Sequence, residues 1–246
     1  MPLRLVQANL KAKDDEAVGR FWAAALGWEV RGPANGATSV VPAGFDWTDP
    51  AAPVCVDVIA VPDPAAVTGR AHIDLATSSE AGQAELVERL IRLGATPADV
   101  GQGDVPWVVL TDPEGNEFCV LEPREIYRDT GPIAALVVDC ADPRAMARFW
   151  GAALDWDVHE VTDHFARLRR AAGTGPFLEF LRTPGGAPGR HRVHLDLVPR
   201  DGADQAAAVD RLRALGATVP VPGGRFSWVV CADPEGNEFC VLAPAQ

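Results

Sequence analysis

Two histidine–aspartate pairs have a spacing that suggests chemistry. His72 lies two residues before Asp74, and His194 lies two residues before Asp196. Residues two apart in an extended strand share a face, so each carboxylate can reach the imidazole beside it. Such a carboxylate could orient a functional histidine, or the two could form a satisfied structural pair. The spacing alone leaves both interpretations open.

Two carboxylates interrupt apolar strands. Glu179 is the only charged residue in the run 177–181, and Asp57 is the only one in the run 54–59. A buried carboxylate is costly without a partner, so each one either has a polar role or points to water. Glu179 is the sharper case and is the candidate catalytic residue.

Cys119 and Cys240 occupy equivalent places in a repeated sequence. The ten residues Asp-Pro-Glu-Gly-Asn-Glu-Phe-Cys-Val-Leu occur at 112–121 and again at 233–242. Proline followed by glycine and asparagine predicts a tight turn between two strands. On the outgoing strand, alternation places each cysteine on the face opposite the neighbouring phenylalanine. The thiols could bind a metal or act as nucleophiles, or they could be inert packing.

Tryptophans are the candidate ligand-binding residues. Trp107 and Trp228 are matched between the two halves, on expected strands, and their rings could stack on a planar ligand. Trp47 lies in a loop of the first half that has no counterpart, so a function for it would be special to that half. Trp22 and Trp150 fall on the apolar faces of expected helices, which indicates core packing.

These residues must be positioned by a chain that is a duplication. Matching segments follow one another in the same order in both halves, and each half predicts two β-α-β-β-β units. The fold class is therefore α+β, with four units forming two domains. We expect the first domain at 1–125, a polar linker at 126–132 and the second domain at 133–246.

The expected elements follow from periodicity and turn residues. Helices are predicted at about 14–26, 80–93, 144–154 and 203–215. Strands are predicted at about 3–10, 28–30, 38–41, 54–61, 71–76, 96–100, 107–110, 118–121, 133–139, 156–161, 165–169, 177–181 and 193–198, with a closing hairpin that ends at 242.

Composition restricts the class of partner. The chain has 246 residues, 48% of them hydrophobic, which is enough for two compact domains. Its net charge of −12 without a basic tract argues against nucleic acid. We find no signal-peptide pattern and no apolar run of spanning length, so we expect a cytoplasmic protein without a membrane partner. The five cysteines have no C-x-x-C spacing, which indicates reduced thiols.

The repeated features resemble the vicinal oxygen chelate superfamily, and within it the glyoxalase-like and bleomycin-resistance-like proteins. The resemblance covers nearly the whole chain twice, through the Phe-Trp helix, the His-x-Asp-Leu strand and the Asp-Pro-Glu-Gly-Asn-Glu-Phe turn. It implies that the sheets of each domain curl around a cavity, and that a divalent metal is held there by the first, fourth, fifth and eighth strands. The implied positions are Gln7, Asp57, His72 and Cys119 in the first domain, and Ala135, Glu179, His194 and Cys240 in the second.

The implied metal set departs from the usual one. Ala135 offers no donor, and cysteine replaces the usual glutamate at Cys119 and Cys240, which argues against glyoxalase I itself. Three protein ligands plus water would suit zinc, and thiolate biases the site towards zinc. Iron, manganese and nickel remain alternatives, as does the absence of any metal. The sequence does not decide whether cavities form within or between the halves.

Two functions follow from the resemblance. The first is the binding of a small organic ligand, such as an aromatic natural product, in the sheet cavity. The alternative is a metal-dependent lyase, isomerase or dioxygenase acting on vicinal oxygens. The partner is then a small-molecule ligand or substrate, and the protein is a monomer or a homodimer. A protein-docking module is disfavoured, because neither half has an exposed amphipathic segment or a run of charge.

Overall fold

The computed structural model describes residues 3–34, 36–64, 70–183, 192–200, 202–220 and 227–243. The strands form two mixed sheets, which we call sheet I and sheet II. Sheet I has the order β14 (Trp228–Ala232), β15 (Glu238–Leu242), β13 (Val193–Pro199), β1 (Leu3–Ala12), β4 (Cys55–Ala60), β3 (Ala37–Val41) and β2 (Glu29–Ala34). Sheet II has the order β10 (Asp157–Val161), β11 (Phe165–Arg169), β12 (Phe177–Arg182), β9 (Ile133–Cys140), β5 (Ala71–Leu75), β8 (Glu117–Val120), β7 (Val108–Thr111) and β6 (Thr96–Pro97).

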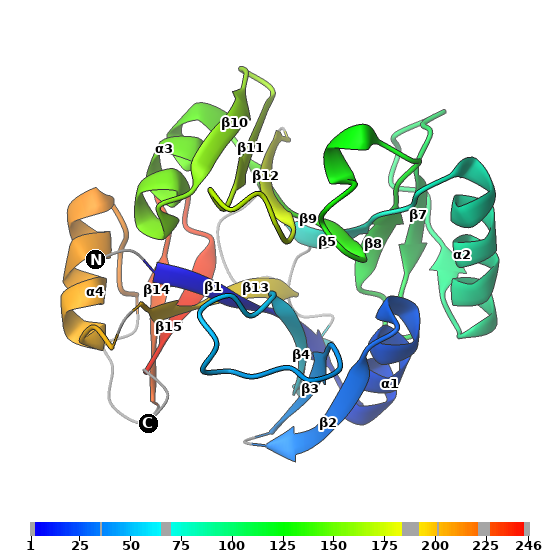
Figure 1. Cartoon of the computed structure of the whole chain (residues 1–246), viewed down its shortest axis with the longest axis horizontal. Helices are drawn as coiled ribbons and strands as arrows, with labels where there is room; N and C mark the ends of the chain where they lie inside the picture. Colours follow the sequence, from blue (N-terminus) through cyan, green and yellow to red (C-terminus); the bar gives the residue numbers. More distant parts are fainter. Residues whose placement is uncertain are drawn as a thin grey trace.

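Each sheet is built from both halves of the chain. In sheet I, β1 pairs antiparallel with β13, which places Asn9 opposite His194. In sheet II, β5 pairs antiparallel with β9, which places His72 opposite Val137. Figure 1 shows the dark-blue β1 beside the yellow β13. The helix-free face of each sheet therefore combines side chains from two sequence halves.

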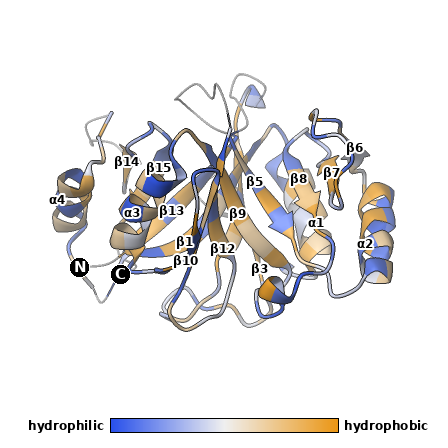
Figure 2. Ribbon diagram, turned by 90° about the horizontal axis from the view of Figure 1, so that it is seen from above, coloured by the Kyte–Doolittle hydropathy of each residue, from blue (hydrophilic) through white to orange (hydrophobic). Residues whose placement is uncertain are grey.

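Four helices lie where the periodicity predicts them: α1 (Asp15–Leu26), α2 (Glu80–Arg92), α3 (Pro143–Leu154) and α4 (Gln205–Leu215). Asp14 caps α1 by accepting a hydrogen bond from the Ala17 amide, and Gly27 ends it at a φ of 69°. The equivalent helix α3 is capped by Asp142 and ends at Asp155, whose φ is 58°. Figure 2 shows α2 and α4 at opposite ends of the molecule, with apolar strands between them.

One apolar core joins the two sheets and all four helices. It includes Trp22 of α1, Leu90 of α2, Trp150 of α3 and Leu212 of α4. Trp22 and Trp150 are 0% and 2% exposed, which confirms their predicted packing role. Successive residues of a strand point to opposite faces of its sheet. A strand residue whose two neighbours enter this core therefore projects from the other face, which no helix covers.

The repeated turn is confirmed. The Asp112 amide donates to the Asn116 carbonyl at 2.9 Å, and Gly115 has a φ of 83°. The second copy repeats this bond between Asp233 and Asn237 at 3.0 Å. Each turn aspartate also accepts a hydrogen bond from a helix tryptophan, Trp22 or Trp150. The turn therefore fixes the helix of one unit to the hairpin of the next.

One predicted strand is shorter in the structure, and the predicted linker contains a helical turn. The strand expected at 96–100 is limited to Thr96–Pro97, and its counterpart in the second half is an isolated bridge between Thr218 and Ala232. The predicted linker overlaps a 3-10 helix, η2 (Glu125–Tyr127), whose Tyr127 is buried. Arg124 places its guanidinium over the Tyr127 ring. Tyr127 and Thr130 of this segment are buried, whereas Ile126 and Arg128 are exposed.

Candidate functional site

The eight metal-type positions are regrouped by the strand pairing. The expected grouping by sequence half is corrected by the structure, because each sheet takes two strands of the set from each half. Sheet I carries Gln7, Asp57, His194 and Cys240 on β1, β4, β13 and β15. Sheet II carries Ala135, Glu179, His72 and Cys119 on β9, β12, β5 and β8.

On sheet I, the polar side chains form one cluster on the helix-free face. Nε2 of His194 lies 3.3 Å from Oδ1 of Asp196. Donor atoms of His194, Asp196 and Cys240 all lie within 4.8 Å of one another. The Gln7 side chain donates a hydrogen bond to Asp57. Strand register brings these side chains together, because Gln7 lies opposite Asp196, which in turn lies beside Cys240.

This cluster carries an excess of negative charge. Burial raises the pKa of Asp57 to about 6, against a hydrogen bond from Ser39, and the charge of Asp196 adds to the rise. Burial and Asp196 also raise the pKa of the Cys240 thiol. Oδ1 of Asp57 is buried and has no hydrogen-bond partner among the described residues. The donor set therefore suits a proton or a cation.

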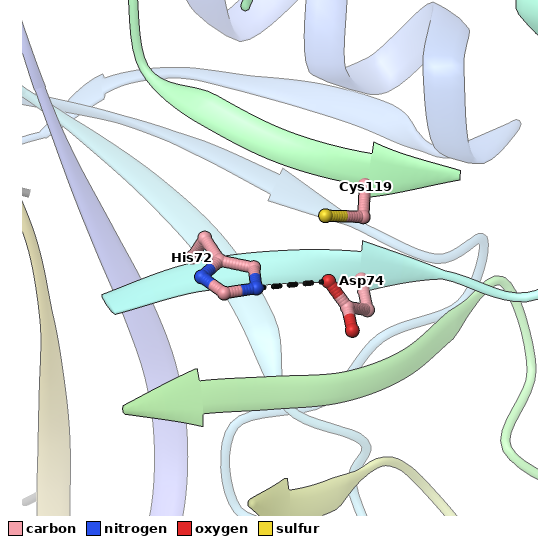
Figure 3. A group of neighbouring side chains, drawn as sticks. All are labelled: His72, Asp74 and Cys119. Atoms are coloured by element: carbon pink, nitrogen blue, oxygen red, sulfur yellow. Dashed lines mark ion pairs between the residues drawn. The ribbon is translucent and has the colours of Figure 1, made fainter. Parts of the chain in front are cut away.

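The sheet II cluster repeats the histidine, aspartate and cysteine. Figure 3 shows His72 and Asp74 side by side on β5, with the Cys119 thiol on the neighbouring β8. Nε2 of His72 lies 3.2 Å from Oδ1 of Asp74. Burial lowers the pKa of His72. The charge of Asp74 and hydrogen bonds with Asp74 and Cys119 have the opposite and larger effect, and the pKa of His72 is well above its ordinary value. A protonated His72 therefore neutralises Asp74.

Glu179 does not join a metal-type group, because other side chains engage it. Tyr127 donates its hydroxyl to Oε1 of Glu179 at 3.0 Å, and Nε of Arg167 lies 3.7 Å from the same atom. Burial nevertheless raises the pKa of Glu179 to about 7, and the Arg167 charge only partly offsets this. Glu179, predicted as a candidate catalytic residue, is thus a buried carboxyl held by a tyrosine and an arginine.

Tyr127 also fills the helix-free face of sheet II. Its ring packs in a buried apolar cluster with Cys119, Ala135, Val137 and Phe177. It lies in the space beside Ala135, the position that offers no donor. Sequence reasoning missed Tyr127 because it lies in the predicted linker. The available signal was that it is the only tyrosine of the chain, next to an apolar isoleucine in a polar segment.

The helix-free face of sheet I carries a cavity of about 860 Å3. Arg4, Val6, Val198 and Leu242 line it from β1, β13 and β15, and Trp47 lines it from its loop. His194 and Cys240 are not among its lining residues. However, Val198 and Leu242 follow Asp196 and Cys240 by two positions on the same face, a step of about 7 Å.

The three candidate ligand-binding tryptophans have different surroundings. Trp47 lines the cavity and packs edge-on against Phe45, with ring centroids 4.7 Å apart. Trp228 lies on β14 opposite Leu242, but is not among the lining residues. Trp107 lies just before β7 of sheet II, where its indole donates to Gln102 and Arg124 lies over its ring. Contact with a ligand remains a prediction for all three.

A hollow of about 440 Å3 lies beside the linker on sheet II. Ala76, Thr77, Arg124, Tyr127 and Arg128 contribute to its wall, and neither His72 nor Cys119 does. The two sheets thus present different surroundings to a ligand. None of the described helices is long and apolar enough to cross a membrane.

Three β-α-β-β-β units and a fourth whose middle strand is reduced to an isolated bridge pair into two sheets. Each sheet has a histidine–aspartate–cysteine group on its helix-free face, and this arrangement defines the class of protein. The family model described as "Glyoxalase-like domain" matches residues 7–121 and 135–242. The chain belongs to this family of the vicinal oxygen chelate superfamily. No curated protein sequence matches the chain.

Solved structures share the fold at low sequence identity. Glyoxalase I from Zea mays is 18% identical with a TM-score of 0.66, and the match covers 98% of this chain and 92% of that one. A proposed dioxygenase from Bacillus subtilis is 15% identical with a TM-score of 0.62, and the match covers 98% of this chain and 85% of that one. At these identities the likeness concerns the fold alone.

Proposed function

We propose that the chain binds a small organic molecule in the cavity on the helix-free face of sheet I. The observation that carries this proposal is the cavity of about 860 Å3 itself. Its volume lies within the range of roughly 300–1,000 Å3 that is usual for small-molecule sites. Its wall combines an aromatic side chain, Trp47, with the apolar Val6, Val198 and Leu242. An aromatic ligand could stack on Trp47 and lie along these strands.

The opposite sheet supports the choice of sheet I. There, Tyr127 and the apolar cluster around it occupy the surface beside Ala135. Tyr127 would have to leave this cluster, and break its bond to Glu179, before a ligand could take its place. We therefore assign ligand binding to sheet I and a structural role to the sheet II cluster.

Filling the cavity should abolish ligand binding. We expect N-phenyl-1-naphthylamine, a neutral aromatic fluorophore, to bind the wild-type chain with one site per molecule and a rise in its emission. Val198→Trp should lower its affinity at least tenfold, because the larger side chain takes up cavity space. Fluorescence titration measures both.

Ala76→Trp is the matched control, because Ala76 and Val198 each lie four residues after their histidine. It should leave the affinity unchanged. Thermal unfolding confirms that both variants fold. Equal affinity in wild type and Val198→Trp would contradict a ligand site on sheet I.

A second function is favoured by the unpaired Oδ1 of Asp57. His194, Asp196 and Cys240, whose donor atoms lie within 4.8 Å of one another, could bind a divalent ion, and Asp57, held by the Gln7 amide, could add to the charge beside it. Such an ion would supply Lewis-acid chemistry towards neighbouring substrate oxygens, as a metal-dependent lyase, isomerase or dioxygenase requires. Thiolate and imidazole donors favour zinc, and cobalt is its spectroscopic substitute.

Cobalt binding tests this second function through a matched pair of cysteines. We expect one Co2+ per chain with a thiolate-to-cobalt absorption band in the near ultraviolet. Cys240→Ser should remove the band, and Cys119→Ser should leave it unchanged, because Ala135 and the engaged Glu179 leave sheet II short of ligands. A band that survives Cys240→Ser and disappears in Cys119→Ser would place the ion on sheet II. Absence of binding in every variant would rule out this second function.

A further inference from the structure

Three arginines converge on the sheet I cavity. Arg4 comes from β1, Arg170 from the segment after β11, and Arg200 from the segment after β13. Only 22 of the 246 residues are lysine or arginine, and the chain as a whole carries a net charge of −12. Gathering three cations from distant segments in one cavity of such a chain is therefore unusual.

No carboxylate of the described residues neutralises these arginines by direct contact. Among the described residues, none of the ion pairs within 4.0 Å involves Arg4, Arg170 or Arg200. Asp155 lines the same cavity, and Asp49 lies close enough to interact electrostatically with Arg4 and Arg170. In the described part of the chain, three positive groups thus face two acidic ones, Asp49 and Asp155, that lie beyond ion-pair distance.

Main-chain carbonyls hold the guanidinium groups in place. Arg4 donates to the carbonyls of Asp49 and Trp47 at 3.2 and 3.0 Å. Arg170 donates to the Ala52 carbonyl at 3.2 Å, and Arg200 to the Leu154 carbonyl at 3.4 Å. Each guanidinium has five N–H donors, so these bonds position the groups and leave further donors for a ligand.

The arginines also repel one another. Burial lowers the pKa of Arg170, and the charges of Arg4 and Arg200 lower it further, against the opposing effect of Asp49. Burial likewise lowers the pKa of Arg4; Asp49 opposes this effect and Arg200 adds to it. Like charges held together in a partly buried cavity destabilise the ligand-free protein. An anion between them would relieve the repulsion.

We propose that Arg4, Arg170 and Arg200 bind the anionic end of the ligand, an oxyanion group with at least two charges such as a phosphate ester or a pair of carboxylates. Guanidinium groups recognise both through paired hydrogen bonds. This inference rests on the proposed ligand site in sheet I. The uncharged part of the ligand then extends past Trp47 and Val198 towards the cluster of His194, Asp196 and Cys240.

Three small aromatic probes test the proposal by isothermal titration calorimetry. Phenyl phosphate carries two negative charges on one phosphate, and phthalate carries one on each of two carboxylates. Benzyl alcohol carries none. We expect one or both anions to bind at least tenfold more tightly than benzyl alcohol, with an affinity that falls as salt rises. The anion that binds more tightly distinguishes phosphate from paired carboxylates. No preference for either anion would overturn the proposal.

Charge-removing variants identify the residues responsible. Arg170→Gln and Arg200→Gln keep a donor for their carbonyls and should each weaken binding of the preferred anion about tenfold or more. Arg148→Gln, on the exposed side of α3, is the control and should change nothing. Unchanged affinity in both cavity variants would overturn the proposal.

Thermal unfolding separates a binding role from a structural one. If Arg170 serves the ligand, Arg170→Gln without anion should unfold at the same temperature as wild type or higher, because a repulsion is removed. A loss of several degrees with no change in anion affinity would mean that Arg170 only fastens the loop at Ala52, and would overturn the proposal.

The two ligand proposals can fail independently. N-phenyl-1-naphthylamine binding that is lost in Val198→Trp, without any anion preference, would keep the sheet I site and reject the arginine cluster. Arginine-dependent anion binding that persists in Val198→Trp, with no site for the neutral fluorophore, would reject the cavity for the organic part and keep an anion site.

Discussion

Replacing Asp112 with alanine should lower the free energy of unfolding by about 3–5 kcal/mol, because several buried donors lose their acceptor at once. The Asp112 carboxylate is 2% exposed. It accepts from the Trp22 indole at 3.1 Å and from the Asn116 amide side chain at 2.7 Å. It also accepts from the main-chain amides of Glu114 and Asn116, both at 3.0 Å. Urea unfolding followed by circular dichroism measures the loss.

The second copy of the turn provides a replicate. Asp233→Ala removes the corresponding acceptor of Trp150 and Asn237 and should destabilise the protein to a similar extent. Asp104→Ala removes an exposed carboxylate and should change stability by no more than about 0.5 kcal/mol. A loss below about 1 kcal/mol in both turn variants would show that the repeated aspartates do not fix the helices.

Glu179→Gln should change the pH dependence of stability by about 3 kcal/mol between pH 4.5 and pH 7. Burial raises the pKa of Glu179 from 4.5 to about 7, with Asp74 adding to the rise and with Arg167, Tyr127 and Arg124 opposing it. The folded protein therefore holds a proton that the unfolded chain releases. The contribution of Glu179 is fully present below pH 4.5 and is lost as pH rises through 7.

The glutamine side chain is neutral at every pH in this window. The variant should therefore gain stability relative to wild type as pH rises through it. Unfolding free energies in urea at pH 4.5 and 7.5 measure the difference. Glu160→Gln is the control, because it removes an exposed carboxylate that lies 3.5 Å from the same Arg167. A difference between wild type and Glu179→Gln that is constant with pH would show that burial does not hold the proton on Glu179.

Local pattern was sufficient for the units of the fold. The helix of Trp22, the turn at Asp112 and the alternation around Cys119 are set by residues within about ten positions, and the structure confirms each. The strand at 96–100 was predicted too long: only Thr96–Pro97 finds a partner, opposite Thr111 and Leu110 of β7. The length of this strand depends on how far β7 pairs with it, and the periodicity of the sequence does not predict that.

The grouping of the site residues could not be obtained in this way. A duplicated chain can pair its units within a half or between halves, and Gln7 has the same local sequence in either arrangement. The arrangement depends on whether β1 pairs with β5 or with β13, and in the structure it pairs with β13. Asp57 and His194 therefore share one sheet although they belong to different halves, on the two strands that flank β1 at Asn9. His72 and Glu179 flank β9 at Val137 in the same way.

Two functional features lie outside any motif. Tyr127 belongs to a polar segment whose composition predicts a linker, and its contact with Glu179 spans fifty-two positions. Arg4, Arg170 and Arg200 are scattered along the sequence, and only the fold brings them to one cavity. Such convergence has no local signature, because each arginine alone resembles an ordinary surface cation.

The pairing of β1 with β13 also governs how the chain can be completed during synthesis. β1 ends at Ala12, and β13 begins at Val193. At translation rates of roughly 5–20 residues per second, the partner strand is made about 10–40 seconds after β1. During that time β4 can pair with one edge of β1, while the other edge stays unpaired until β13 has been synthesised. A nascent chain that stops before β13 therefore leaves an unpaired strand edge, the kind of surface that chaperones protect and that aggregation exploits.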